Sequence, residues 1–135
     1  MNYKTIDMKN FPSRAHFEYF KGLAYPYVGF TVNVDITGFL AQQKRLGLPF
    51  YLALAYCVTR AANSVPEFRR RIHGDGIIEY DWCHGSHTVA LPDETYCYCT
   101  LDCRMPFEEY LPRAAEAWER AKAASSIEDG DDADS

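Results

Sequence analysis

The fold of this chain is decided by residues 14–37, which read RAHFEYFKGLAYPYVGFTVNVDIT. Phe17, Phe20 and Leu23 recur every three residues, the spacing of one face of a helix. Ser13 lies just ahead of them and can accept hydrogen bonds from the free amides of a first helical turn. The first part of the stretch therefore predicts a short helix capped by Ser13 and followed by a loop.

The second part of the stretch changes to the period of a strand. Between residues 27 and 35, apolar side chains alternate with polar or small ones; the apolar members are Val28, Phe30, Val32 and Val34. This alternation predicts a half-buried strand. Asp35 and Thr37 then offer side-chain oxygens that can cap a following helix.

Aromatic side chains gather around the loop between this helix and this strand. They are Tyr19, Phe20, Tyr25, Tyr27 and Phe30. Aromatic rings offer large apolar faces, and tyrosine adds a polar tip, so rings beside a loop can build a ligand pocket. The stretch thus predicts a pocket wall as well as a packing element.

The rest of the chain predicts further helices and strands in an α/β arrangement. Helices are expected from Thr37 to a stop at Gly47, over residues 50–63, and over residues 106–124, where Pro112 implies a kink or a later start. Strands are expected over residues 3–6, 69–73, 77–81, 86–91 and 95–101, with a hairpin turn at residues 74–76. Residues 50–63 are apolar on nearly every side, which predicts a buried central helix. The three arginines at 69–71 alternate between strand faces, which favours a solvated face with one structural ion pair over a phosphate site.

Length and charge exclude several classes of protein. The chain has 135 residues, 47% of them hydrophobic and 15% aromatic, which fits one folded domain. Its net charge of −5 comes from five acids in residues 126–135, expected to be an acidic loop or tail, so the body is neutral. Residues 1–125 have no net positive charge, so the sequence gives no sign of a basic surface for nucleic acid or an anionic membrane. With no signal peptide and no apolar run of membrane-spanning length, the expected location is cytoplasmic.

The cysteines and histidines give no motif for catalysis or metal binding. Five cysteines without a secretion signal are expected to be free thiols buried among apolar groups. A zinc cluster with His84 and His87 is conceivable, but the paired Cys-x2-Cys spacing of zinc knuckles is missing. His16 is expected to be a packed residue of its helix, His73 to be exposed, and His84 and His87 have no triad spacing.

Seven short pieces, taken in order, resemble one known family. They are residues 16–20 (HFEYF), 34–37 (VDIT), 50–51 (FY), Asn63 with 67–69 (EFR), 80–81 (YD), 88–89 (TV) and 95–96 (TY). Their order and spacing over residues 1 to about 125 resemble those of the chloramphenicol acetyltransferase family. The chain departs from the family pattern at Tyr80, where the family usually has tryptophan.

The resemblance implies a fold, a reaction and an assembly. The fold would be α/β, a two-layer sandwich of a mixed sheet packed by helices, of the CoA-dependent acyltransferase type and incomplete in this chain. The reaction would be acetyl transfer from acetyl-CoA, without a metal, to a hydroxyl of chloramphenicol or a related acceptor, as in antibiotic resistance. The full-length form would be a homotrimer. The family's general base lies in a His-His-x3-Asp-Gly motif beyond another group of strands, and residues 1–135 contain no such motif. Residues 1–125 would then be a truncated, N-terminal portion of the acetyltransferase domain, inactive on its own.

The resemblance also implies which residues line the acceptor pocket. By position they are Tyr19, Phe20, Ala24, Pro26, Val28, Tyr96 and Tyr98, and no catalytic residue lies in this chain. For Val28 and Tyr96, plain core packing is an equal alternative. Tyr98 stands where drug-acetylating members often have a small residue, so its ring would narrow the pocket.

Two alternative functions remain open from the sequence. One is a non-catalytic, truncated relative that binds a small ligand or pairs with full-length subunits. The other is a metal-binding module. Residues 27–35, 50–64 and 95–101 carry apolar faces that fit a larger sheet, so the isolated chain is expected to associate or aggregate.

Overall fold

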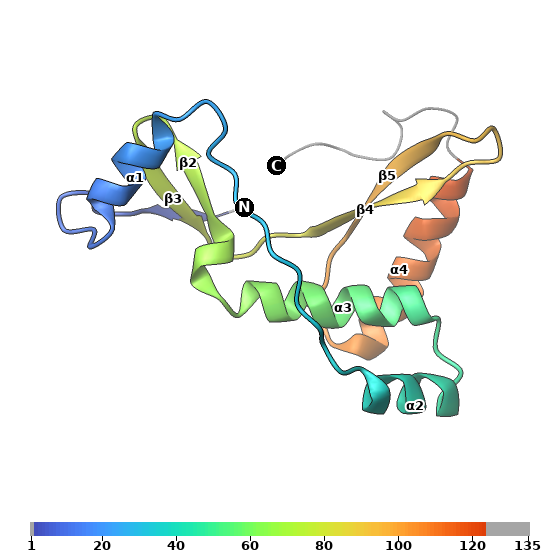
Figure 1. Ribbon diagram of the computed structural model, residues 1–135. Coiled ribbons are helices and arrows are strands. Elements are labelled where there is room, and N and C mark those ends of the chain that lie inside the picture. The colour runs from blue at the N-terminus through green and yellow to red at the C-terminus, as the bar shows by residue number, and fades with distance from the viewer. Residues whose placement is uncertain (1, 124–135) are drawn as a thin grey trace.

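A computed structural model describes residues 2–123 (Figure 1). Its helices are α1 (Arg14–Lys21), α2 (Thr37–Arg45), α3 (Phe50–Asn63) and α4 (Phe107–Lys122), with a 3₁₀ turn, η1 (Pro66–Arg69). Its strands are β1 (Tyr3–Thr5), β2 (Arg70–His73), β3 (Gly76–Tyr80), β4 (Gly85–Ala90) and β5 (Tyr96–Leu101). The acidic stretch expected over residues 126–135 lies outside the described residues.

The strands form two separate antiparallel sheets. One has the order β1-β3-β2, and the other is the β4-β5 hairpin. The predicted hairpin turn joins β2 to β3, where Gly74 has φ +58°, a conformation that favours glycine. The predicted α/β class is confirmed, but within residues 2–123 the strands form two antiparallel sheets and not one mixed sheet.

The main core lies between the β4-β5 hairpin and the helices α3 and α4. Period-2 alternation turns Cys97, Cys99 and Leu101 of β5 inward, and all three are buried. On α4 the buried residues are Tyr110, Ala114 and Ala121, which belong to the same core as β5, and Tyr110 is only 1% exposed. The Tyr110 hydroxyl donates a hydrogen bond to the Leu52 carbonyl of α3, at 2.8 Å. This core fixes α3, α4 and the hairpin as one packed unit.

A smaller unit is formed by the three-stranded sheet and α1, at the opposite end of the molecule in Figure 1. Glu79 of β3 is 6% exposed and pairs with Arg70 at 3.0 Å and Lys4 at 3.1 Å. The structural ion pair expected from the arginine run is therefore present. Arg69 lies 3.9 Å from the same carboxylate and also donates to the carbonyls of Asn63 and Tyr80, and so ties the end of α3 to β3.

The strand predicted over residues 27–35 is not formed. Figure 1 shows the chain between α1 and α2 as an extended trace between the two units. Its apolar side chains are exposed: Val28 by 86%, Phe30 by 87%, and Val32 and Val34 by 73% each. A strand needs a neighbouring ladder, and this segment pairs with no other strand in the described part of the chain.

Three local expectations about the helices were also wrong. Ser13 precedes α1 but makes no side-chain capping bond. Residues 50–63 form α3 as predicted, yet Leu52 and Ala53 alone among its residues are buried, because sheet and helix cover only one face. The later start offered for the last helix is wrong, because α4 begins at Phe107 and contains Pro112, whose missing N–H deprives a single carbonyl, that of Glu108, of its helical donor; the alternative, a kink, stays a prediction.

Asp35 was expected to cap the next helix with its side chain, and it bonds at the start of that helix without occupying the capping position. Asp35 accepts hydrogen bonds from the Thr37 amide at 2.9 Å and from the Thr37 hydroxyl at 2.6 Å. This carboxylate closes a turn ahead of α2, while Ile36 occupies the capping position itself. At the other end, Gly47 stops α2 with φ +63°, as predicted.

Candidate functional site

A hollow of about 370 Å³ lies between α1 and the β2-β3 hairpin. Its size is within the range of small-molecule sites. Its wall is mostly apolar, and its lining residues are Phe11, Ser13, His16, Phe17, Phe20, Lys21, Pro26, Ile72 and Ile77.

Local structure explains why these residues face one another. His16 and Phe17 lie three and four positions after Ser13, the residue ahead of α1, and Phe20 lies seven positions after it, so these side chains share one face of the helix. On the opposite side, Ile72 of β2 is the ladder partner of Ile77 of β3. The helix face and the strand pair enclose an apolar space with polar groups at its rim.

The polar rim is formed by three side chains of α1 and its approach. Lys21 pairs with Asp75 at 3.0 Å and lies 5.5 Å above the Phe17 ring, so it ties α1 to the hairpin turn. Ser13 and His16 are both exposed at the same rim. The expectation that His16 is a packed residue of its helix was wrong, because α1 covers a small sheet and His16 is exposed beside the hollow.

The structure brings together only part of the predicted pocket wall. Phe20 and Pro26 both line the hollow. The ring of Tyr19 packs edge-on against Phe20, with centroids 5.2 Å apart, but is 67% exposed. Ala24 and Val28 are exposed and belong to the extended segment outside the lining.

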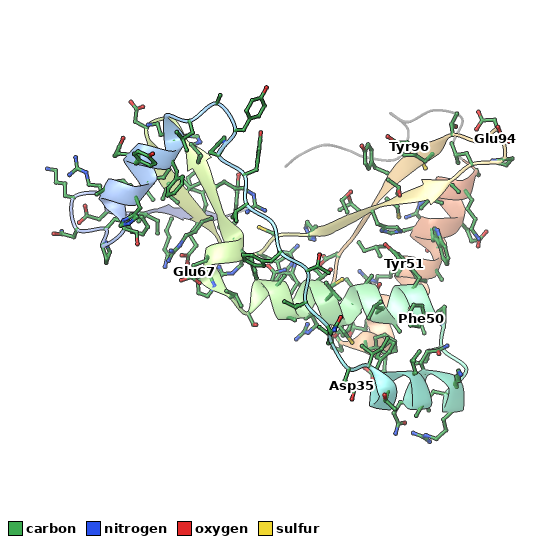
Figure 2. The ribbon with its side chains drawn as sticks, viewed as in Figure 1. Asp35, Phe50, Tyr51, Glu67, Glu94 and Tyr96 are labelled. Carbon is green, nitrogen blue, oxygen red and sulfur yellow. The ribbon has the colours of Figure 1, made fainter. Side chains whose placement is uncertain are left out.

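Tyr96 and Tyr98 lie elsewhere, on the outer face of β5. Their rings meet edge-on with centroids 5.8 Å apart. Figure 2 places Tyr96 on the β4-β5 hairpin, at the other end of the molecule from α1. Within one chain these two tyrosines therefore do not share a hollow with Phe20 and Pro26, and their part in a pocket stays a prediction.

Sequence reasoning missed seven of the residues that line the hollow: Phe11, Ser13, His16, Phe17, Lys21, Ile72 and Ile77. Two signals could have found them. The spacing of residues 13, 16, 17 and 20 marks one helix face, and a two-residue turn at 74–75 sets Ile72 opposite Ile77.

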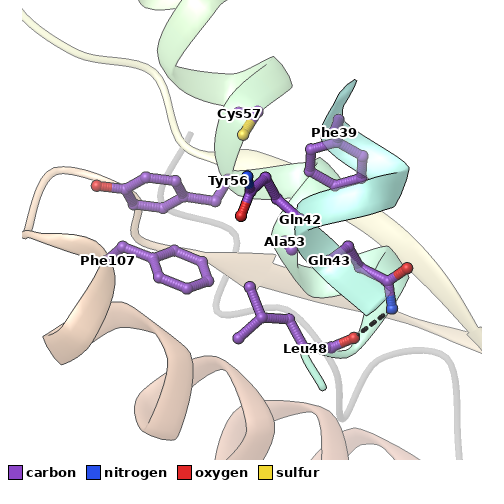
Figure 3. A pocket seen from close by; sticks show the side chains of 8 residues that line it. All are labelled: Phe39, Gln42, Gln43, Leu48, Ala53, Tyr56, Cys57 and Phe107. Carbon is purple, nitrogen blue, oxygen red and sulfur yellow. Dashed lines mark hydrogen bonds between the residues drawn. The ribbon is translucent and has the colours of Figure 1, made fainter. Parts of the chain in front are cut away.

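A second hollow, of about 210 Å³, lies among α2, α3 and α4 (Figure 3). Phe39, Leu48 and Phe107 make its wall apolar, and the Gln43 side chain donates a hydrogen bond to the Leu48 carbonyl beside it. Cys57 also lines it and is exposed, which corrects the expectation that the cysteines are buried. Since no predicted site residue lies here, this hollow is not the candidate acceptor site.

The two histidines near β4 are held by packing. His84 lies with Nδ1 3.7 Å from an Asp102 oxygen. His87 packs against the Tyr51 ring, with centroids 4.9 Å apart, and its buried Nε2 has no hydrogen-bond partner among the described residues. Burial lowers the pKa of His87, which favours its neutral form. In a catalytic triad the histidine ring nitrogens contact a nucleophile and an orienting carboxylate. Because His87 Nε2 has no such partner in the described part of the chain, His87 does not match a triad histidine.

The described residues offer no grouping for a metal and no membrane span. All five cysteines are free thiols, as predicted. Within residues 2–123, no three or more His, Cys, Asp or Glu side chains come close enough to hold a metal ion. In the same part of the chain, no helix combines the length and the hydropathy needed to cross a membrane.

Comparison with known proteins gives a consistent result. The family model for chloramphenicol acetyltransferase matches residues 1–123. A chloramphenicol acetyltransferase of Klebsiella sp is 33% identical over 110 residues, which cover 81% of this chain and 50% of that protein. Chloramphenicol acetyltransferase 3 of Escherichia coli is 26% identical over 129 residues, covering 94% of this chain and 60% of its own length.

The fold agrees with these matches. A solved chloramphenicol acetyltransferase structure superposes with a TM-score of 0.84 at 24% identity, covering 96% of this chain and 61% of the other. This chain spans about half the length of the curated relatives it matches. With a family match over residues 1–123 and identities up to 33%, the chain belongs to the chloramphenicol acetyltransferase family.

Proposed function

We propose that this chain is part of an acetyl-CoA-dependent O-acetyltransferase that acetylates a hydroxyl of chloramphenicol or a related acceptor. The observation that carries the proposal is the family match over residues 1–123. The relatives are named chloramphenicol acetyltransferases, and the acceptor and the co-substrate, acetyl-CoA, are inferred from that name.

In this proposal the chain supplies a wall of the acceptor pocket and not the base. The apolar hollow beside Phe20 and Pro26 supports the role, because an aromatic wall suits a nitrophenyl acceptor. The general base would come from a His-His-x3-Asp-Gly motif, which residues 1–135 lack. That base would take the proton of the acceptor hydroxyl, and the alkoxide would attack the thioester carbonyl of acetyl-CoA.

The assembly and location form part of the same proposal. A homotrimer would let the wall of one subunit face the base of a neighbour, and this would bring Tyr96 or Tyr98 of one subunit toward an acceptor held by another. We propose that the protein is located in the cytoplasm because acetyl-CoA is a cytoplasmic metabolite. Sedimentation of the assembled enzyme tests the trimer directly.

The test uses a chimera of residues 1–123 followed by the half of the Klebsiella sp relative that lies outside the match. Release of the CoA thiol is measured with acetyl-CoA and chloramphenicol. We expect activity from the chimera and none from the 135-residue chain alone, because only the chimera carries the base. Phe20→Ala should raise KM for the acceptor about tenfold by removing apolar contact area. Leu46→Ala, at the exposed position that follows α2, should leave KM unchanged.

A chimera that folds and binds acetyl-CoA but acetylates neither chloramphenicol nor a related acceptor would disprove the proposed reaction. The exposed apolar segment at residues 27–35 favours one alternative, a non-catalytic subunit-interaction module. Native mass spectrometry of the chain mixed with a full-length relative separates the two, because such a module would form mixed oligomers without adding activity.

A further inference from the structure

The helix α1 lies beside the β2-β3 hairpin (Figure 1) and packs only loosely against it. None of its residues is buried, and only Phe17 and Lys21, which lie one helical turn apart, are half-buried. The space between the helix and the hairpin is the hollow of about 370 Å³ and not an interlocked core. Side-chain packing among the described residues therefore does little to fix the position of α1.

One ion pair joins α1 to the hairpin. Lys21 Nζ lies 3.0 Å from Asp75 Oδ1 and 5.5 Å from the centre of the Phe17 ring, and the Lys21 side chain is 28% exposed. Across residues 2–123, no other hydrogen bond or ion pair connects α1 with this hairpin. The position of the helix over the hollow thus depends on this one pair.

The hairpin gives Asp75 a fixed place. The ladder of β2 and β3 closes at the pair of His73 and Gly76, which leaves Gly74 and Asp75 as a two-residue turn. Gly74 has φ +58°, which suits the tight turns that match the twist of a hairpin. Because the register of the ladder fixes the turn, the carboxylate of Asp75 is a stationary anchor for Lys21.

We propose that Lys21 and Asp75 are positioning residues of the acceptor site, which hold the C-terminal end of α1 across the hollow and so set the place of Phe20. This inference rests on the function proposed above for the hollow. Neither residue takes part in the chemical step, because the pair acts through the helix that carries Phe20.

Pre-organisation gives the pair its effect on binding. Phe20 is the neighbour of Lys21 in sequence and lines the hollow together with Phe17. An acceptor that enters a wall already in place loses less free energy to the ordering of that wall. The pair should therefore lower KM for the acceptor and leave kcat unchanged, as expected for an interaction equally strong in the ground state and the transition state.

A direct contact between Lys21 and the acceptor is the competing explanation, because Lys21 also lines the hollow. The two explanations differ at Asp75, which is not a lining residue. If the pair positions α1, losing either partner has the same effect. If Lys21 binds the acceptor, Asp75→Asn frees the ammonium group and does not raise KM.

The experiment measures kcat and KM for chloramphenicol in the chimera at saturating acetyl-CoA. Lys21→Met and Asp75→Asn should each raise KM about threefold, the size of effect expected from a largely exposed ion pair, with kcat unchanged. The double variant should show no further rise, because both substitutions break one pair. Lys21→Arg, which keeps the charge, should keep the parent KM.

Lys122 offers a matched control. Its Nζ lies 4.6 Å from the centre of the Trp118 ring and 3.1 Å from a Glu119 oxygen, so it makes the same kinds of contact as Lys21 but within the single helix α4. Lys122→Met should leave KM unchanged.

Salt supplies a second readout that a general loss of stability would not reproduce. Raising the salt concentration from about 0.05 M to about 0.5 M should raise the parent KM toward that of Lys21→Met and leave the variant's KM unchanged, because salt screens exposed pairs. Chloramphenicol carries no charge, so this response would not arise from attraction of the acceptor itself.

Amide exchange tests the tie without any reaction. The amides of residues 18–21 should exchange at least about threefold faster in Lys21→Met and in Asp75→Asn than in the parent chimera, and at the parent rate in Lys122→Met. Unchanged exchange would overturn the proposal. So would an active chimera in which the exchange changes but KM does not, or in which Lys21→Met alone raises KM, since the last result shows a direct contact.

The two readouts separate this inference from the proposed reaction. A chimera that acetylates no acceptor but shows the expected exchange pattern would support the tie and count against the reaction. An active chimera whose KM and exchange ignore both substitutions would do the opposite.

Discussion

Asn63 holds both backbone polar groups of Cys83. Its side-chain amide donates to the Cys83 carbonyl at 2.8 Å, and the Cys83 amide donates to its side-chain oxygen at 2.8 Å. The two residues are 20 positions apart, at the end of α3 and in the connection from β3 to β4. This pair of bonds joins the smaller sheet to the main core, together with Arg69, which donates to the Asn63 carbonyl at 3.0 Å.

Replacing Asn63 should loosen this junction. Asn63→Ala leaves the amide and carbonyl of Cys83 without partners in a half-buried place, and we expect a loss of about 1–3 kcal/mol in the free energy of unfolding. Asn63→Asp keeps the acceptor for the Cys83 amide and should lose less. Urea titration of the chimera measures both; equal stability of Asn63→Ala and the parent would contradict a junction role.

Tyr110 should be stabilising through its hydroxyl as well as its ring. Tyr110→Phe leaves the Leu52 carbonyl without its 2.8 Å donor inside the core, which should cost about 1–2 kcal/mol. Tyr3→Phe, at a 51% exposed position, is the matched control and should change little. Thermal unfolding of the two variants compares them.

Tyr110 also predicts a decline in stability at high pH. Burial raises the pKa of its phenol above the ordinary value of 10. The unfolded chain therefore releases this proton first, so the contribution is complete below pH 10 and falls as the pH rises beyond it. In Tyr110→Phe this part of the decline should disappear, which unfolding midpoints measured between pH 8 and pH 11 would reveal. An unchanged decline would show that other groups cause it.

Gly85 should not tolerate a side chain while Thr59 is present. A Cβ at Gly85 would come within 2.5 Å of the Thr59 hydroxyl oxygen, and the branched Thr59 side chain has little freedom to move away. We expect Gly85→Ala to destabilise by about 1–3 kcal/mol. In a protein that already carries Thr59→Ala, Gly85→Ala should cost much less unfolding free energy, because the clashing hydroxyl is gone. If the two substitutions instead lower the unfolding free energy additively, the contact with Thr59 is not the cause.

Glu79 should make the fold sensitive to acid. A hydrogen bond from Arg70, together with Lys4, holds the pKa of Glu79 below its ordinary value of 4.5. Its stabilising contribution is therefore present above pH 4.5 and lost as the pH falls through the lowered pKa. Glu79→Gln should flatten the fall in urea midpoint between pH 6 and pH 3. Asp75→Asn, which removes an exposed partner of Lys21, is the control and should leave that fall in place.

Much of the fold follows from local signals. Helical spacing and stop signals predicted α2 with its end at Gly47, α3 and α4, and the turn at residues 74–76 predicted the β2-β3 hairpin. These elements form because their hydrogen bonds are local and one apolar face finds a neighbour in the same chain.

The candidate site was predictable only in part. Phe20 and Pro26 were expected in a pocket wall and line the same hollow. Ile72 and Ile77 were not expected there, because their contribution depends on how α1 lies across a sheet that is distant in sequence. His16 was expected to be packed because its helix is apolar, whereas the packing of α1 leaves it exposed at the rim.

By itself the sequence determined the elements, their order and the family pattern, since these depend on spacing along the chain. Tertiary structure alone decided which faces are covered. Residues 14–37 show the difference: α1 finds a sheet and forms the hollow, but residues 27–35 carry a complete strand pattern and remain extended. The physical reason is that a helix satisfies its own backbone, whereas a strand becomes one only when neighbouring strands supply the other half of its hydrogen bonds.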